Sequence, residues 1–280
     1  MAACELYRQP LLEHLVYVKL RHWDRAVREL AASALAALTP ADPHFVAGAE
    51  CLSVLAAGCL SADLPTRHGA ACALAAILRA LHACGHTLPA DVQSSVVGVV
   101  PAVEKARLYR GKGGEIMRAA VCRLVEAIAY VNLPLTTALK KALHASLDES
   151  LRHPTKDIVL AAASALKPFA ASYMTSCSTD ALDRSVHKYA AALQSEPNPA
   201  VRRGAALALG ALPPRLLLAA KDRVLATLGN ATVEEEDVDL RDAETRVYAV
   251  RSLVTVCQVA SGSSGEEQEQ EVRIRLHARI

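Results

Sequence analysis

The chain has 280 residues, of which 52% are apolar and only 4% aromatic, and its formal net charge is +2 from 31 basic and 29 acidic side chains. This apolar content excludes a disordered protein, and the near-neutral charge gives no general attraction to nucleic acid or to anionic membranes. A core of mainly Ala, Leu and Val favours closely packed helices over a β-sheet. The composition therefore predicts an all-α fold.

The N-terminal segment lacks the pattern of a secretion signal. Its first residues, MAACELYRQPLLEHL, hold an acidic residue and a proline where a signal peptide has a basic start and an apolar run. No apolar run reaches the roughly 18 residues that a membrane span needs. The eight cysteines form no C-x-x-C pair, which favours reduced core thiols over a disulfide framework. We therefore expect an intracellular protein without an integral membrane segment.

Residues 20–38, LRHWDRAVRELAASALAAL, begin a pattern that recurs along the chain: an arginine followed by an alanine-rich apolar face. Six copies align at positions 28, 67, 118, 159, 202 and 246, although Val159 stands in place of the arginine in the fourth copy. The copies are separated by 39, 51, 41, 43 and 44 residues. These spacings lie near the period of HEAT and armadillo repeats, roughly 40–47 residues.

Other apolar helical patterns lie between these copies, at residues 45–60, 91–108, 135–151 and 214–228. Each repeat is therefore expected to be a helix pair, and neighbouring pairs must stack because one pair cannot bury its apolar faces alone. Prolines fall between most of the helices, but Pro101 and Pro168 fall inside them, where we expect kinks or early stops. The sequence predicts a HEAT/armadillo-like α-solenoid of about six helix pairs over residues 1–260, followed by a low-complexity, disordered tail at 261–280.

Four pairs of residues, each pair four positions apart, mark the start of a second helix. The first member is an acid or amide suited to capping the helix, and the second is an arginine with five donors. The pairs are Asp24 and Arg28, Asp63 and Arg67, Asn198 and Arg202, and Asp242 and Arg246. We expect each pair to meet, and the arginine to bridge to the equivalent turn of the next repeat. The resulting ladder would fix the register between repeats.

The third repeat is lengthened by a glycine-rich, basic loop, YRGKGGE, at residues 109–115. Tyr109, Arg110 and Lys112 of this loop are candidates for contact with a partner protein. The loop does not match the phosphate-binding pattern G-x-x-x-x-G-K-[ST], and no strand precedes it. A second local feature, the acidic run at 232–244, is typical of a surface loop, with a docking site for a basic partner as the alternative.

Motifs for catalysis or metal binding are weak. The sequence contains neither G-x-S-x-G nor H-E-x-x-H, and no glycine-rich strand-to-helix fingerprint. His82, Cys84 and His86 are close in sequence, but no second pair of zinc ligands lies nearby. Basic residues are dispersed and aromatic platforms are few. We expect a non-enzymatic protein without a cofactor, a bound metal or a nucleic-acid partner.

Three stretches carry a resemblance to a known family: EHLVYVKLRHWDRAVRELAASALAAL, LPTRHGAACALA and LYRGKGGEIMRAAVCRLVEAI. They resemble the C-terminal helical-repeat region of the tubulin-specific chaperone D family, also called tubulin-folding cofactor D. The likeness extends more diffusely to about Val259, and chains of the family are several times longer.

The resemblance implies a function in assembling and dismantling the αβ-tubulin heterodimer. It implies β-tubulin, other tubulin-folding cofactors and an Arf-like small GTPase as partners, a contribution to GTP hydrolysis by tubulin, and a cytoplasmic, cytoskeleton-associated location. The repeat alone fits a generic HEAT scaffold equally well, such as a transport or phosphatase adaptor. Only the stretches VYVKLRHWD and LYRGKGGE separate the two interpretations.

Overall fold

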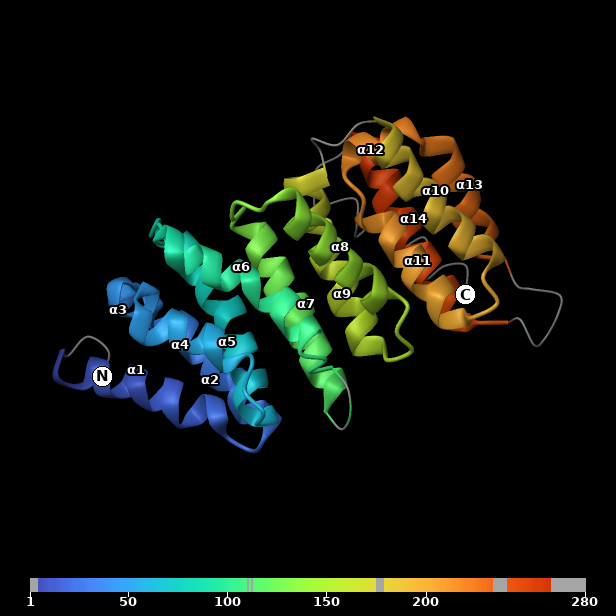
Figure 1. Ribbon diagram of the computed structural model, residues 1–280. Coiled ribbons are helices and arrows are strands. Elements are labelled where there is room, and N and C mark those ends of the chain that lie inside the picture. The colour runs from blue at the N-terminus through green and yellow to red at the C-terminus, as the bar shows by residue number, and fades with distance from the viewer. Residues whose placement is uncertain (1–4, 110, 112, 175–178, 234–240, 263–280) are drawn as a thin grey trace, which may run out of the picture. The chain divides into compact units, whose positions relative to one another are not determined.

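The computed structural model describes residues 5–109, 111, 113–174, 179–233 and 241–262. These residues form α-helices joined by short turns, with brief 3-10 and π-helical segments and no strand (Figure 1). The chain divides into two compact units, Met1–Ser150 and Leu151–Ile280. The prediction of an all-α fold is confirmed. Of the predicted tail at 261–280, only Ser261 and Gly262 lie within the described residues.

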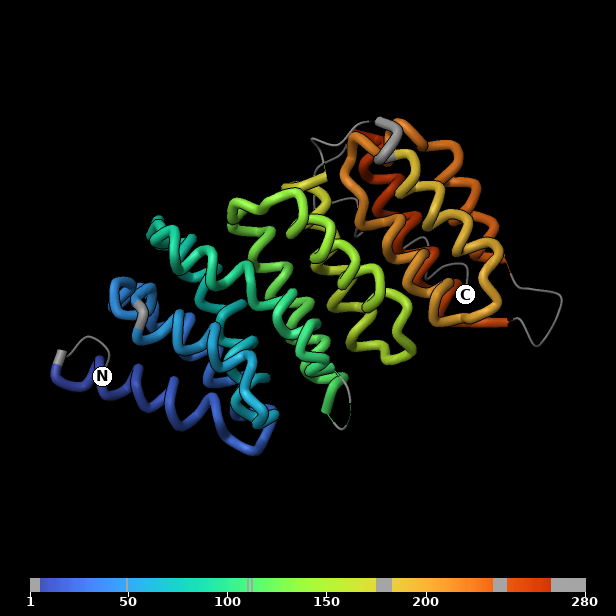
Figure 2. The backbone as a smooth tube through the Cα atoms, viewed as in Figure 1, coloured from blue at the N-terminus to red at the C-terminus, as the bar shows by residue number. Residues whose placement is uncertain are grey.

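The first unit stacks three helix pairs against one another. Its second helices α2, α5 and α7 pack side by side in chain order, and α1, α4 and α6 pack against them in turn (Figure 2). The helices are α1 (Glu5–Tyr17), α2 (Arg25–Leu38), α3 (Pro43–Ala47), α4 (Val54–Gly58), α5 (Leu64–Ala83), α6 (Ala90–Lys105), α7 (Gly114–Tyr130) and α8 (Thr137–Leu151).

The second unit repeats this arrangement. Its second helices α9, α11 and α14 form a row, α10 packs on α11 and α13, and α12 and α13 pack on α14. The helices are α9 (Lys156–Phe169), α10 (Thr179–Ser195), α11 (Pro199–Ala211), α12 (Pro214–Ala219), α13 (Lys221–Asn230) and α14 (Ala243–Ala260). All six aligned copies of the repeat pattern thus lie in helices, and the prediction of stacked helix pairs is confirmed within each unit.

Two of the expected first helices are interrupted. Residues 45–60 form α3, a π-helical turn at Ala49–Ser53 and α4, because Gly48 adopts an extended conformation with φ −74° and ψ 170°. Residues 214–228 divide into α12 and α13 at Ala220. The early stop expected at Pro101 does not occur, since α6 continues to Lys105, whereas α9 ends one residue after Pro168.

Glycines two residues after the aligned arginine allow the closest approaches between neighbouring repeats. A Cβ atom added to Gly69 would collide with the backbone carbonyl of Leu20, and one added to Gly204 would collide with that of Leu151. Both glycines lie inside helices, where glycine is normally unfavourable relative to alanine. Close packing of the helix on the preceding turn therefore accounts for glycine at these two positions.

Candidate protein-binding face

The capping residues of the repeat accept hydrogen bonds from backbone N–H groups at the start of the second helices. Asp24 accepts from Ala26, Asp63 from Thr66, Asn198 from Ala200 and Asp242 from Thr245. Each bond satisfies a donor that the first turn of a helix leaves unpaired. These side-chain oxygens are therefore directed at their own helix.

Three of the aligned arginines, Arg28, Arg67 and Arg202, turn back onto the loop that precedes their helix. The backbone carbonyls that accept their hydrogen bonds lie five or six residues before the arginine. Nη1 of Arg28 donates to the backbone carbonyls of His22 and Trp23 at 2.7 and 2.8 Å. Nη1 of Arg67 donates to the carbonyl of Ala62 at 2.7 Å, and Nη1 of Arg202 to that of Glu196 at 3.2 Å. Arg28 and Arg67 are buried, so these carbonyls supply acceptors for guanidinium donors that are largely removed from water. Each of these arginines thus fixes the turn of its own repeat.

Contacts with the next repeat include one in each unit. Nε of Arg28 donates to Nδ1 of His68 in α5 at 3.1 Å. In the second unit the neighbour of the aligned arginine, Arg203, makes a bidentate pair with Asp242 at 2.8 and 2.6 Å. Burial alone would raise the pKa of Asp242. The hydrogen bonds from Arg203 and Thr245 lower it by more than burial raises it, so the pKa is about 2. The repeat pattern did not single out His68 or Arg203, and the role of the ladder in setting register stays a prediction.

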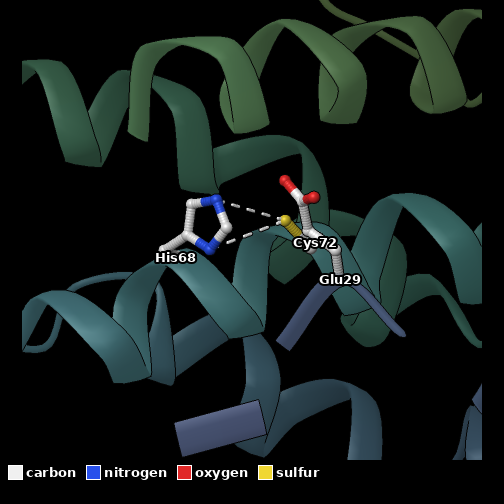
Figure 3. A group of neighbouring side chains, drawn as sticks. All are labelled: Glu29, His68 and Cys72. Atoms are coloured by element: carbon white, nitrogen blue, oxygen red, sulfur yellow. Dashed lines mark hydrogen bonds between the residues drawn. The ribbon is translucent and has the colours of Figure 1, made fainter. Parts of the chain in front are cut away.

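A polar cluster lies between α2 and α5, formed by Glu29, His68 and Cys72 (Figure 3). One ligand atom from each residue lies within 4.8 Å of the others. Sγ of Cys72 is 3.6 Å from Nε2 and 3.9 Å from Nδ1 of His68. Burial, with the nearby Arg28 charge, lowers the pKa of His68 to about 4, and burial raises that of Cys72 to about 11. At neutral pH both groups are therefore uncharged.

The hydrogen bond from Arg28 decides what this cluster can do. Because a guanidinium only donates, Nδ1 of His68 must be the acceptor, so the proton of the neutral ring is on Nε2. Nε2 lies 3.6 Å from the sulfur of Cys72, and in this tautomer neither ring nitrogen keeps a lone pair for a metal or for the thiol proton. Glu29 is already paired with Arg25 at 2.9 Å and Arg123 at 3.3 Å. The donor set thus fits a structural network better than a metal site or a Cys-His nucleophile.

Glu29 and Cys72 also line an open groove of about 440 Å³ across α2, α5 and α7. We call this the α2–α5–α7 groove. Small side chains, mostly apolar, form the floor of the groove, and charged side chains form its rim. The lining residues are Glu29, Ala32, Ser33, Cys72, Ala75, Ala76, Arg79, Arg123 and Glu126. On the rim, Arg79 pairs with Glu126 at 2.9 Å, and Arg123 with Glu29.

An exposed tyrosine adjoins the groove. The guanidinium of Arg79 lies 5.2 Å from the centroid of the Tyr130 ring, and the His82 ring meets the same tyrosine edge-on at 5.9 Å. Tyr130 is 57% exposed. Tyrosine and arginine are among the residue types that most often anchor protein interfaces. This combination makes the row of second helices in the first unit the candidate protein-binding face.

The loop predicted for partner contact is only partly described. Arg110 and Lys112 lie outside the described residues. Tyr109 is partly buried, and the guanidinium of Arg118 lies 4.6 Å from its ring centroid. Burial raises the pKa of its hydroxyl. Its ring therefore packs against its own chain, and its contact with a partner stays a prediction.

The remaining candidates from the sequence lie apart from the groove or from each other. The His82 ring contacts Tyr130, whereas His86 packs on His44 with ring centroids 5.0 Å apart. The sequence did contain a signal for the groove: Arg123 and Glu126 are charged residues within the otherwise apolar run of the third copy. Most of the acidic run, residues 234–240, lies outside the described residues.

No family model matches the chain. A curated relative, tubulin-specific chaperone D of Dictyostelium discoideum, is 21% identical to it over 323 residues, an alignment that covers 89% of this chain. The chain is similar to tubulin-specific chaperone D. It spans only 22% of that relative's length. The resemblance noted in the three sequence stretches is thus confirmed along most of the chain.

The solved structures that match this chain include two crystal structures of engineered proteins. They are 22% and 21% identical to this chain, with TM-scores of 0.48 and 0.47. The matches cover 89% and 88% of this chain and 97% and 98% of those chains. Within the described ranges, no helix has both the length and the apolar character that crossing a membrane would require.

Proposed function

We propose that this chain is a non-enzymatic module of a tubulin-folding cofactor that binds β-tubulin. The observation that carries the proposal is the similarity to tubulin-specific chaperone D over 89% of the chain. Stacked helix pairs support it, because each unit offers a continuous row of helix faces rather than a small enclosed site. Holding a folded subunit requires a wide and partly polar surface from which the subunit can be released.

The proposal includes the partners and the location that belong to such a function. The module acts in the cytoplasm with other tubulin-folding cofactors and an Arf-like small GTPase, in assembly and disassembly of the αβ-tubulin heterodimer. Together with those cofactors it contributes to GTP hydrolysis by tubulin and associates with the cytoskeleton. We assign no arginine to that step.

A retention experiment with purified β-tubulin tests this proposal. The full chain is immobilised through a terminal tag, and a designed helical-repeat protein of similar length with the same tag serves as the control. Retention of β-tubulin by the chain and not by the control is the expected result. If the chain fails to retain β-tubulin while the longer Dictyostelium relative retains it under the same conditions, the proposal for this chain is wrong.

A further inference from the structure

We propose that the α2–α5–α7 groove binds an acidic peptide segment of a partner protein. The groove crosses three helices that come from three successive repeats, so it is a feature of their stacking and not of one helix. Its lining combines an apolar floor with charged side chains on the rim. The floor determines which side chains of a bound peptide fit, and the rim determines which charge that peptide carries.

The floor is made of small side chains. Ala32 and Ala75 are buried, Cys72 is 7% exposed, and Ala76 is partly exposed. Alanine methyl groups leave space above the helices, and larger charged residues complete the lining. A peptide backbone with small side chains fits against such a floor and removes its apolar atoms from water.

On the rim, arginine is more accessible than glutamate. The side chains of Arg79 and Arg123 are 41% and 43% exposed, whereas the Glu126 and Glu29 side chains they pair with are 21% and 35% exposed. Arg25, which is 39% exposed and lies outside the groove lining, also pairs with Glu29. The lining itself holds two arginines and two glutamates, and because the arginines are the more exposed, the positive charges are the more accessible to an approaching partner.

Arginine can hold two carboxylates at once. A guanidinium has five N–H donors, so Arg79 and Arg123 keep donors for a carboxylate of a partner while they contact Glu126 and Glu29. The internal glutamates hold the long arginine side chains in place over the groove, which lowers the entropy lost when a ligand binds. Tyr130 beside Arg79 adds an exposed aromatic ring to this end of the surface.

The same arrangement favours a peptide over a nucleic acid. Glu29 and Glu126 lie within the lining and repel a run of phosphates, whose binding depends on an uninterrupted positive track. Single-stranded nucleic acid also needs aromatic platforms for successive bases, and Tyr130 supplies one ring. The carboxylates of an acidic peptide instead sit on rotatable side chains, so some can reach the arginines while others turn away from Glu29 and Glu126.

A binding measurement with defined peptides tests the inference on the full chain. Fluorescence anisotropy compares a labelled decaglutamate with a decaglutamine of the same length. Decaglutamate is expected to bind, and binding is expected to weaken as salt is raised. The double variant Arg79→Gln/Arg123→Gln should weaken it by about tenfold, since two charge-assisted contacts are lost. The matched control is Arg152→Gln, which removes an exposed arginine outside the groove and should leave binding unchanged.

A gain-of-affinity variant separates a binding role from a structural one. Glu126→Gln removes the carboxylate that competes for Arg79 and should tighten decaglutamate binding by about threefold. A merely structural ion pair would instead make both Glu126→Gln and the double arginine variant equally harmful. The circular dichroism spectrum and melting temperature of every variant establish that it is folded.

The inference shares one premise with the proposed function, namely that the chain acts by binding proteins. Binding of β-tubulin and binding of an acidic peptide in the groove can therefore fail separately. Equal binding of decaglutamate and decaglutamine overturns the inference, as does an equal effect of the groove and control variants. Tighter binding of a labelled oligothymidylate would also overturn it. Retention of β-tubulin without decaglutamate binding leaves the proposed function intact and removes this inference, whereas the opposite result removes the proposed function and supports the groove.

Discussion

His68 makes the stability of the first unit depend on pH. The imidazole is fully buried and accepts the Nε–H of Arg28, and protonation would destroy that acceptor and place two positive charges in contact. Burial and the Arg28 charge lower the pKa of His68 from 6.5 to about 4. The unfolded chain therefore takes up this proton at higher pH than the folded chain does. Stability from the neutral ring is complete above pH 6.5 and is lost as the pH falls toward 4.

The size of this effect follows from the pKa difference. At about 1.4 kcal/mol per pKa unit, the change from 6.5 to about 4 corresponds to about 3 kcal/mol of unfolding free energy. The variant His68→Gln keeps an oxygen acceptor for Arg28 but does not titrate. It should lack this part of the acid sensitivity. His68→Leu leaves the buried donor of Arg28 without a partner and should cost about 1–3 kcal/mol at pH 7.

Urea unfolding followed by circular dichroism at 222 nm measures both effects. The free energy of unfolding is determined at pH 7.5, 6.5, 5.5 and 4.5 for the natural chain and for His68→Gln, and the difference between the two curves cancels the carboxyl groups that titrate in both. This difference should change by up to about 3 kcal/mol as the pH falls. Parallel curves, with the two proteins losing equal stability on acidification, would refute the assignment of a buried neutral acceptor.

Two further predictions concern the contacts between repeats. Gly69→Ala should destabilise the chain by about 2 kcal/mol or more, because the added Cβ meets the Leu20 carbonyl. Gly98→Ala lies in open space on α6 and should stabilise the chain by about 0.5–1 kcal/mol. Thermal melts that rank the two variants the other way would contradict the packing described. Asp242→Ala removes a helix cap and the partner of Arg203, so it should lower the free energy of unfolding in urea by about 2–4 kcal/mol. Asp63→Ala removes only an exposed cap and should lower it by about 1 kcal/mol. Equal losses for the two variants would show that the Arg203 pair adds nothing to stability.

The repeat could be predicted from the sequence because its signals are local. Apolar periodicity places the second helices, and Asp24 or Asn198 directly before such a segment marks where a helix begins. A cap depends only on the two or three residues that follow it, and these geometries recur in the structure without information from other repeats. Helix pairs of this size can then bury their faces only by stacking.

The hydrogen-bond partners of the arginines could not be predicted in the same way. Arg202 and Arg203 are neighbours in the sequence, yet the first bonds the loop before its helix and the second bonds Asp242 in the next repeat. Successive residues on a helix point about 100° apart, so the rotation of the helix decides which side chain faces which partner. That rotation is set by packing across repeats, including the close contact at Gly204, and not by local pattern.

The groove arises where the repeats differ from one another. Arg28 has an acceptor in the next repeat because His68 follows the aligned arginine there, but the residue at the same place one repeat later is Ala119, and Nε of the buried Arg67 has no hydrogen-bond partner. The Glu29, His68 and Cys72 cluster is therefore specific to the first pair of neighbours. Arg123 and Glu126 likewise stand where the first two copies have Ser33 and Cys72, and Ala36 and Ala75. The shared positions form the caps and turns of the repeats, and the positions that vary between repeats give the groove its charged side chains.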